Sequence, residues 1–150
     1  MGMAIFNHSM AWERSCILAG AIGTMERQVE RSVRYAQERR QFGQPIGKFQ
    51  AVAHRIVEMK VRLEAARLLL YRQGWLMSRG RPSALDAAMV KLCISEAFVS
   101  SSLDALQVHG AYGYMAEYEL EREVRDAVGS RLYSGTSDIQ RNVIAGLMGL

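Results

Sequence analysis

The sequence has little proline and little cysteine, and it contains no long run of apolar residues. Only 2 of its 150 residues are proline, so long stretches can form helices without interruption. No apolar segment approaches the roughly 20 residues that a membrane-spanning helix needs, and no secretory signal is visible. We therefore expect a folded, helix-rich domain with no membrane partner.

The two cysteines, Cys16 and Cys93, show no metal-ligand spacing and lie in apolar stretches. The simplest interpretation is two buried free thiols in a reducing compartment, which predicts a cytoplasmic protein without a metal site. The net charge of +4 is too small to argue for a nucleic-acid partner. Basic residues alternate with glutamates, which is typical of solvated helix faces.

Apolar residues recur every three or four positions along most of the chain, as in amphipathic helices. No segment alternates with period two for long enough to predict a strand. A poorly ordered or extended tail is expected over residues 1–9. Long helices are expected over residues 10–40, 46–78 and 83–109, and shorter helices over residues 117–132 and 137–149. The predicted fold is all-α, an up-down helical bundle that forms one domain over residues 10–150.

Three breaks between these helices have unusual compositions: a corner at residues 42–47, a glycine-tyrosine loop after His109, and a turn before Ser137. Gly43 can take a positive φ and end the first helix. Ser137 and Gln140 have the spacing of a capping box that begins the last helix. Each break alone also fits a structural interpretation, in which Phe42 packs against the end of the core and His109 simply ends a helix.

The breaks and the helices beside them contain four motifs in a fixed order. They read YAxxRxxFGxxIxxxQ over residues 35–50, QxxGxxGY over 107–114, RDA over 125–127 and YxGTSxIQR over 133–141. On these motifs the chain resembles the C-terminal α-helical domain of the acyl-CoA dehydrogenase flavoprotein family, from about residue 10 to the end. The resemblance implies an FAD-dependent enzyme that desaturates an acyl thioester: a base takes the α proton, and the β hydrogen leaves as hydride to the flavin.

The resemblance also implies which residues contact FAD. In the family the first motif contacts the ADP half of an FAD held by the neighbouring subunit, which carries over to Arg39, Gln41 and Phe42. A guanidinium suits a pyrophosphate because it binds phosphate oxygens bidentately. Further implied contacts are Gln107, Gly110 and Ala111 for that same FAD, and Thr136 and Asp138 for the subunit's own FAD. We expect these helix corners to converge in space and form half of a flavin site.

The position of the catalytic base departs from the commonest family pattern. Many members place a glutamate directly after the tyrosine of the last loop, where this chain has Ser134, and a serine cannot take an α proton unaided. A branch that includes isovaleryl- and long-chain acyl-CoA dehydrogenases uses a glutamate that precedes an arginine on the first helix of this domain. The segment MAWER, residues 10–14, matches that pattern. The resemblance thus makes Glu13 the candidate base, with Arg14 positioning it or the thioester. The alternative is that Glu13 is simply an acidic residue near a helix N-terminus, where the helix dipole favours a negative charge.

The loop YSGTS is similar to that of family members that oxidise aminoacyl or other small acyl groups on a carrier protein, such as prolyl groups. The implied partner is therefore an acyl-CoA or an acyl or peptidyl carrier protein thioester, with Tyr133 and Gly135 as further substrate contacts. In the family this domain builds the core of a homo-oligomer, a dimer or tetramer. A non-catalytic helical oligomerisation module is the alternative function.

Full-length family members also carry an N-terminal helical domain and a β-barrel domain, and the flavin ring lies between the barrel and the helical domain. The 150 residues contain neither of these domains. We therefore expect the purified chain to bind FAD weakly and to lack dehydrogenase activity. Its visible absorbance spectrum measures this: a colourless preparation agrees with the expectation, and one equivalent of bound flavin contradicts it.

Overall fold

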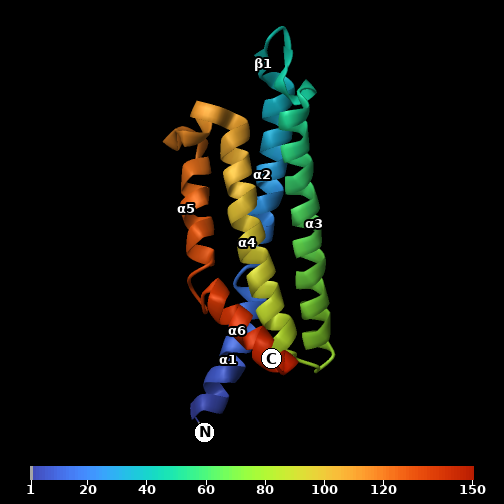
Figure 1. Ribbon diagram of the computed structural model, residues 1–150, viewed down its shortest axis with the longest axis vertical. Coiled ribbons are helices and arrows are strands. Elements are labelled where there is room, and N and C mark those ends of the chain that lie inside the picture. The colour runs from blue at the N-terminus through green and yellow to red at the C-terminus, as the bar shows by residue number, and fades with distance from the viewer. Residues whose placement is uncertain (1) are drawn as a thin grey trace.

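The computed structural model describes residues 2–150, which form a bundle of helices around one central helix (Figure 1). The α-helices of this range are α1 (Gly2–Cys16), α2 (Ala19–Glu38), α3 (Gln50–Ser78), α4 (Ala84–His109), α5 (Leu120–Ser130) and α6 (Ser137–Met148). Helix α4 packs against all the others. The prediction of an all-α, up-down bundle is confirmed.

The helix expected over residues 10–40 is in fact two helices. A turn at Ile17 and Leu18 separates α1 from α2, and it places Leu18 in the core with 1% of its surface exposed. Helix α1 leaves the lower end of the bundle at an angle (Figure 1). The expected tail is wrong for residues 2–9, which are helical because no proline or glycine interrupts residues 3–16. Met1 lies outside the described residues.

The corner after α2 is a short β-hairpin. Strands β1 (Arg40–Gln41) and β2 (Gln44–Pro45) pair antiparallel, and a 3₁₀ turn, η1 (Ile46–Lys48), leads into α3. Phe42 and Gly43 both have positive φ, 50° and 81°, as a two-residue hairpin turn requires. The sequence did not predict these strands because two residues are too few to show a period. Phe42 is 91% exposed, so the interpretation that it packs against the core is wrong.

The main core lies between α2, α3 and α4. Its fully buried members, each at most 1% exposed, are Leu18, Met25, Leu63, Ala66, Val90 and Ile94, together with Ala127 of α5. The cysteines do not belong to this set: Cys16 is exposed and Cys93 is half-buried, so the prediction of two buried thiols is wrong. Cys16 is exposed because it ends α1 at the turn, where that helix leaves the bundle.

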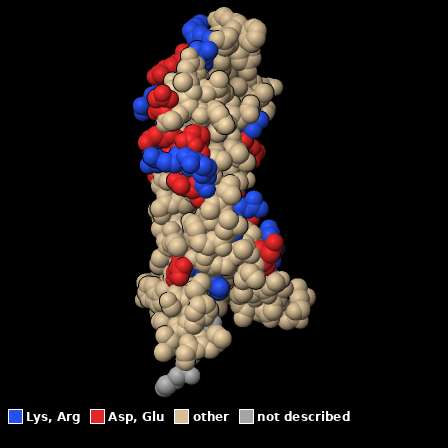
Figure 2. All heavy atoms as spheres, turned by 90° about the vertical axis from the view of Figure 1, so that its left-hand side faces the viewer, with Lys and Arg blue, Asp and Glu red and all other residues tan. Residues whose placement is uncertain are grey.

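Charged side chains of both signs mix on the surface rather than gathering by sign. Figure 2 shows acidic and basic residues side by side over the upper part of one face, with few charges near the lower end. On α5, Arg122 pairs with Glu119 at 2.9 Å and Arg125 with Glu121 at 2.9 Å. These pairs agree with the prediction of solvated helix faces. No helix in residues 2–150 is long and apolar enough to span a membrane.

Two leucines of α3 provide a matched test of where the stability of the bundle lies. Leu63 is 1% exposed in the core, whereas Leu68 is 68% exposed on the same helix. We expect Leu63→Ala to lower the free energy of unfolding by about 2–5 kcal/mol, because it removes buried methyl groups and leaves a cavity. Leu68→Ala should change it by about 0.5 kcal/mol or less. Urea denaturation of both variants measures the difference; equal losses would contradict the packing described above.

Candidate functional site

The candidate site residues form two groups at opposite ends of the bundle (Figure 1). Residues of α1 meet the loop between α5 and α6 at the lower end. The hairpin and the segment that follows α4 lie at the upper end, separated from the first group by α4, whose 26 residues span roughly 39 Å. The expectation that all the helix corners converge is therefore wrong within one chain. The long helices that join the corners run the length of the bundle, so the corners at their two ends stay far apart.

At the lower end, the first helix contacts the last loop through two neighbouring residues. The Ser134 hydroxyl donates a hydrogen bond to Oε1 of Glu13. Nε of Arg14 donates to the Ser134 carbonyl oxygen at 3.2 Å. Glu13 lies near the C-terminal end of α1, where the helix dipole disfavours a carboxylate. The interpretation of Glu13 as an acid favoured by a helix N-terminus is therefore wrong.

The loop itself adopts a constrained turn. Ser134 has φ 57° and Gly135 has φ 93°, both in the left-handed region. Nε2 of Gln140 donates to the carbonyl oxygens of Ser134 and Gly135, at 3.1 and 3.0 Å. A Cβ at residue 135 would lie 2.6 Å from that Nε2, so only glycine fits there without displacing Gln140.

Helix α6 begins differently from the predicted capping box. Thr136, not Ser137, is its N-cap, and its Oγ1 accepts a hydrogen bond from the backbone N–H of Ile139 at 3.3 Å. The Ser137 hydroxyl instead donates to Glu96 on α4 at 2.6 Å. The Gln140 side chain is not free to cap the helix, because it holds the turn that precedes it.

Asp138 is one of the residues that the family resemblance assigned to FAD, although an acid would repel a phosphate. It is exposed, and its carboxylate pairs with Arg141 at 2.8 Å. The Arg141 cation in this ion pair offsets the negative charge of Asp138, which would otherwise repel a phosphate. Thr136 lies two residues earlier at the start of the same helix, whose N-terminal N–H groups favour anions.

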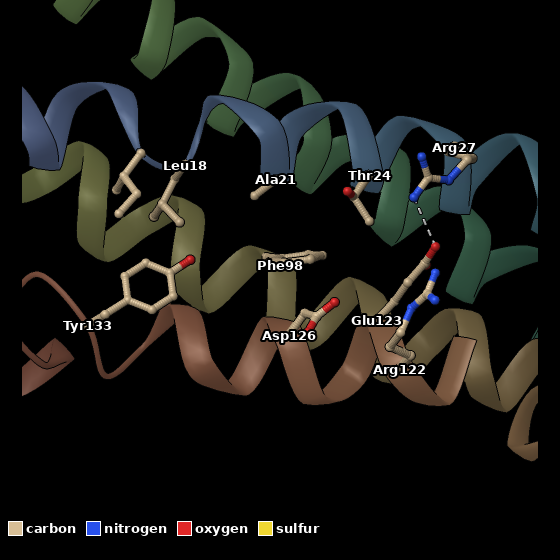
Figure 3. A pocket seen from close by; sticks show the side chains of 10 residues that line it. Leu18, Ala21, Thr24, Arg27, Phe98, Arg122, Glu123, Asp126 and Tyr133 are labelled. Carbon is tan, nitrogen blue, oxygen red and sulfur yellow. Dashed lines mark hydrogen bonds and ion pairs between the residues drawn. The ribbon is translucent and has the colours of Figure 1, made fainter. Parts of the chain in front are cut away.

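Tyr133 borders a cavity of about 190 Å³ between α2, α4 and α5 (Figure 3). The cavity is lined by Ile17, Leu18, Ala21, Thr24, Arg27, Phe98, Arg122, Glu123, Asp126 and Tyr133. Figure 3 shows the Tyr133 ring beside Leu18, with Asp126 on the neighbouring turn of α5. Burial, and to a smaller extent the Asp126 charge, raises the pKa of Tyr133. The phenol therefore stays protonated at neutral pH and can donate a hydrogen bond.

A buried carboxylate closes the far end of this cavity. Glu123 is 5% exposed and accepts hydrogen bonds from Arg27 at 3.1 Å and from Gln28 at 2.8 Å (Figure 3). Gln28 also donates to the Ser102 hydroxyl at 2.9 Å. This network joins α2, α4 and α5, so we interpret it as structural support for the cavity.

At the upper end, an aromatic cluster joins α2 to the two 3₁₀ turns, η2 (Gly110–Tyr114) and η3 (Ala116–Tyr118), that follow α4. Tyr35 stacks on His109 with ring centroids 4.3 Å apart, and the Arg39 guanidinium lies 5.6 Å above the Tyr112 ring. Nδ1 of His109 contacts the Ala105 carbonyl oxygen at 2.8 Å, and burial lowers the pKa of the imidazole. His109 is thus a neutral residue that packs at the end of α4, which agrees with the interpretation that it simply ends a helix.

The FAD candidates of this end are all accessible: Arg39, Gln41, Phe42, Gln107, Gly110 and Ala111. No carboxylate of residues 2–150 lies within ion-pair distance of Arg39. The space beside Gly110 is open, since a Cβ added there would have no neighbouring atom within 4 Å. An exposed guanidinium, an exposed aromatic ring and open glycine backbone fit a nucleotide that carries a diphosphate. The assignment of these residues to FAD stays a prediction.

Lys91 on α4 was missed by the sequence reasoning. It is fully buried, and its Nζ has no hydrogen-bond partner in the described part of the chain. Burial lowers its pKa, the Glu96 carboxylate opposes that change, and the Arg14 charge adds to it. Spacing could have revealed it, because Lys91 lies four residues after Ala87 and three before Ile94 on the apolar stripe.

The sequence model of the family described as acyl-CoA dehydrogenase, C-terminal domain, matches residues 1–148, and the chain belongs to this family. An L-prolyl-[peptidyl-carrier protein] dehydrogenase of Pseudomonas fluorescens is 49% identical over 144 residues, which cover 96% of this chain and 38% of that protein. The enzyme with the same description from a Serratia species is 46% identical over 149 residues, which cover 99% and 39%. The resemblance inferred from the four motifs is confirmed.

Solved structures show the same relationship. The structure described as the prolyl acyl carrier protein oxidase AnaB has a TM-score of 0.98 and 58% identity, covering 99% of this chain and 39% of that one. The structure of PigA with FAD and proline has a TM-score of 0.94 and 45% identity, covering 98% and 38%. The chain thus spans about two fifths of the length of the curated relatives that it matches.

The buried Lys91 predicts a stability that depends on pH. Because its pKa in the folded chain is below the ordinary 10.5, the unfolded chain binds more protons in the alkaline range, and stability rises as the pH approaches 10.5. Lys91→Met removes a buried amine that lacks a hydrogen-bond partner and should raise the free energy of unfolding by about 1–3 kcal/mol at neutral pH. This gain should shrink toward the alkaline limit.

Urea denaturation at neutral and at alkaline pH measures the gain. Lys48→Met is the matched control, because Lys48 is exposed and its replacement should give no pH-dependent change. A gain from Lys91→Met that is equal at both pH values would contradict the burial of a charged amine.

Proposed function

We propose that this chain is the C-terminal helical part of an FAD-dependent dehydrogenase that oxidises an acyl thioester between its α and β carbons. One observation supports this most strongly: the carboxylate of Glu13 lies against Ser134, the position at which many family members place the catalytic base. The base would thus act from the same point in space, although it comes from the opposite end of the sequence.

In the proposed reaction, a carboxylate oxygen of Glu13 takes the α proton of the thioester. The electron pair of that C–H bond forms the α–β double bond, while the β hydrogen leaves with its own electron pair. When bound, FAD supplies the acceptor for this hydride. Glu13 ends the step as a neutral carboxylic acid, so the thioester has lost one proton and one hydride.

Arg14 and the turn at Ser134 would hold the reacting groups in place. The Arg14 guanidinium binds the Ser134 carbonyl and lies near Gly135, where a Cβ would be 3.6 Å from its Nη2. Tyr133 would border the acyl group from the cavity described above, as a hydrogen-bond donor. These contacts support the assignment of Arg14, Tyr133 and Gly135 to the substrate side of the site.

The separation of the two ends supports a cofactor shared between subunits. We infer that Thr136 and Asp138 at the lower end contact the subunit's own FAD, near the proposed base. The upper-end residues around Arg39 would contact the FAD of a neighbouring subunit, because they lie too far from Glu13 to serve the same molecule. This arrangement requires a homo-oligomer, a dimer or tetramer.

We infer a carrier-protein thioester as the substrate, with a prolyl or similarly small aminoacyl group. The relatives whose descriptions name prolyl carrier-protein substrates are 46–58% identical to this chain. The human short-chain specific acyl-CoA dehydrogenase is 39% identical. An ordinary short acyl-CoA is the alternative substrate, and it would use the same base.

Glu13→Gln in the complete enzyme tests the proposed base. The amide keeps the shape of the side chain but cannot take a proton, so we expect flavin reduction to slow by about a hundredfold or more. Anaerobic stopped-flow bleaching of the flavin with prolyl carrier-protein and acyl-CoA thioesters measures the rate. Glu30→Gln, at an exposed position of α2, is the control and should react at the normal rate. Unchanged bleaching by Glu13→Gln would exclude Glu13 from the mechanism.

A further inference from the structure

Ser134 has a backbone conformation that a serine rarely adopts. Its φ of 57° lies in the left-handed region, where glycine is favoured and other residues are strained by about 1 kcal/mol or more. Glycine follows directly at residue 135, also with positive φ. A second glycine would satisfy the backbone better than serine, so the serine side chain needs a separate explanation.

The turn holds Ser134 firmly from both sides. Its carbonyl oxygen accepts hydrogen bonds from Nε of Arg14 at 3.2 Å and from Nε2 of Gln140 at 3.1 Å. Gln140 is fully buried, so this anchor cannot move freely. The carbonyl group of residue 134 is therefore held between α1 and α6, which also sets the direction of the Cα–Cβ bond of Ser134.

That direction brings the Ser134 hydroxyl to Oε1 of Glu13. Helix α1 is held on its other side as well, since Nε2 of Gln73 on α3 donates to the buried Ser15 hydroxyl at 2.8 Å. Ser15 in turn donates to the Ala11 carbonyl at 2.7 Å. The backbone that carries Glu13 and the backbone that carries Ser134 are thus both held by hydrogen bonds from other elements of the bundle.

We propose that Ser134 is a positioning residue for the base. Its hydroxyl binds one carboxylate oxygen of Glu13, which fixes the side-chain rotamer and leaves Oε2 to take the α proton. This inference rests on the proposed function, in which Glu13 is the base.

Replacing Ser134 in the complete, FAD-loaded enzyme tests the inference. Ser134→Gly removes the hydroxyl and relieves the backbone. We expect flavin reduction at saturating substrate to slow by about three- to tenfold, while the substrate concentration that gives half the maximal rate stays unchanged, because the lost hydrogen bond positions the base and not the thioester. The thermal unfolding temperature should stay near that of the unmodified enzyme, because relief of strain offsets the lost hydrogen bond.

Two further variants separate the hydroxyl from other effects. Ser134→Thr restores the hydroxyl and should recover most of the lost rate of flavin reduction, although its β-branched side chain lowers the unfolding temperature. Ser137→Ala is the matched control: it removes a serine that binds a different carboxylate, Glu96, and should leave the rate of flavin reduction unchanged.

The outcomes distinguish this inference from the proposed function. A Ser134→Gly enzyme that reduces its flavin at the normal rate, beside an inactive Glu13→Gln enzyme, would overturn the positioning role and leave the base in place. Equal losses of rate in Ser134→Gly and Ser134→Thr would also overturn it, since the hydroxyl would then be irrelevant. Full activity of Glu13→Gln would overturn the proposed function itself and the positioning role with it.

Discussion

The packing of α4 on nearly all sides fixes where the other helices lie. Its buried positions are mostly small or β-branched, among them Ala87, Ala88, Val90, Ile94 and Ala105, each at most 1% exposed. Small side chains let neighbouring helices approach closely, and the packing of shaped side chains allows few other arrangements. As a result α1 and α6, from opposite ends of the sequence, come to the same end of α4. The contact between Glu13 and Ser134 is a consequence of this packing.

The same central helix carries polar groups that the core must accommodate. Ser102 is satisfied by Gln28, and Glu96 binds Ser137 and Arg131 from the α5–α6 segment. Lys91 has no such partner and lies close enough to Arg14 for the two charges to interact. Burying polar groups costs stability unless each finds a partner, so their positions restrict the register of the helices around α4. The lower end of the bundle is thus fixed by hydrogen bonds as well as by apolar packing.

Periodicity predicted the bundle and most helix ends, because apolar spacing reports directly on which face is buried. It failed where a short-range choice depends on the tertiary structure: the turn at Leu18, the strands around Phe42, and the cap of α6 at Thr136. The motifs identified the candidate residues but did not predict their arrangement in space. No local sequence feature indicates that Arg39 and Thr136 lie at opposite ends of the bundle. Gln140 illustrates the limit. Its spacing fits a cap, whereas its side chain is taken by the carbonyl groups of Ser134 and Gly135.

A glutamate in the last turn of a helix faces an unfavourable dipole, typically by about 0.3–1 kcal/mol. The structure offsets this at Glu13 with two neighbours: Arg14, whose cation is favoured at a helix C-terminus, and Ser134, whose hydroxyl binds the carboxylate. Both act through the same turn, because Arg14 binds the carbonyl group of the residue whose hydroxyl holds Glu13. A carboxylate supplied by α1 can therefore occupy the place of one supplied by the loop only if the loop is shaped to receive it. The left-handed backbone at Ser134 is what gives the loop that shape.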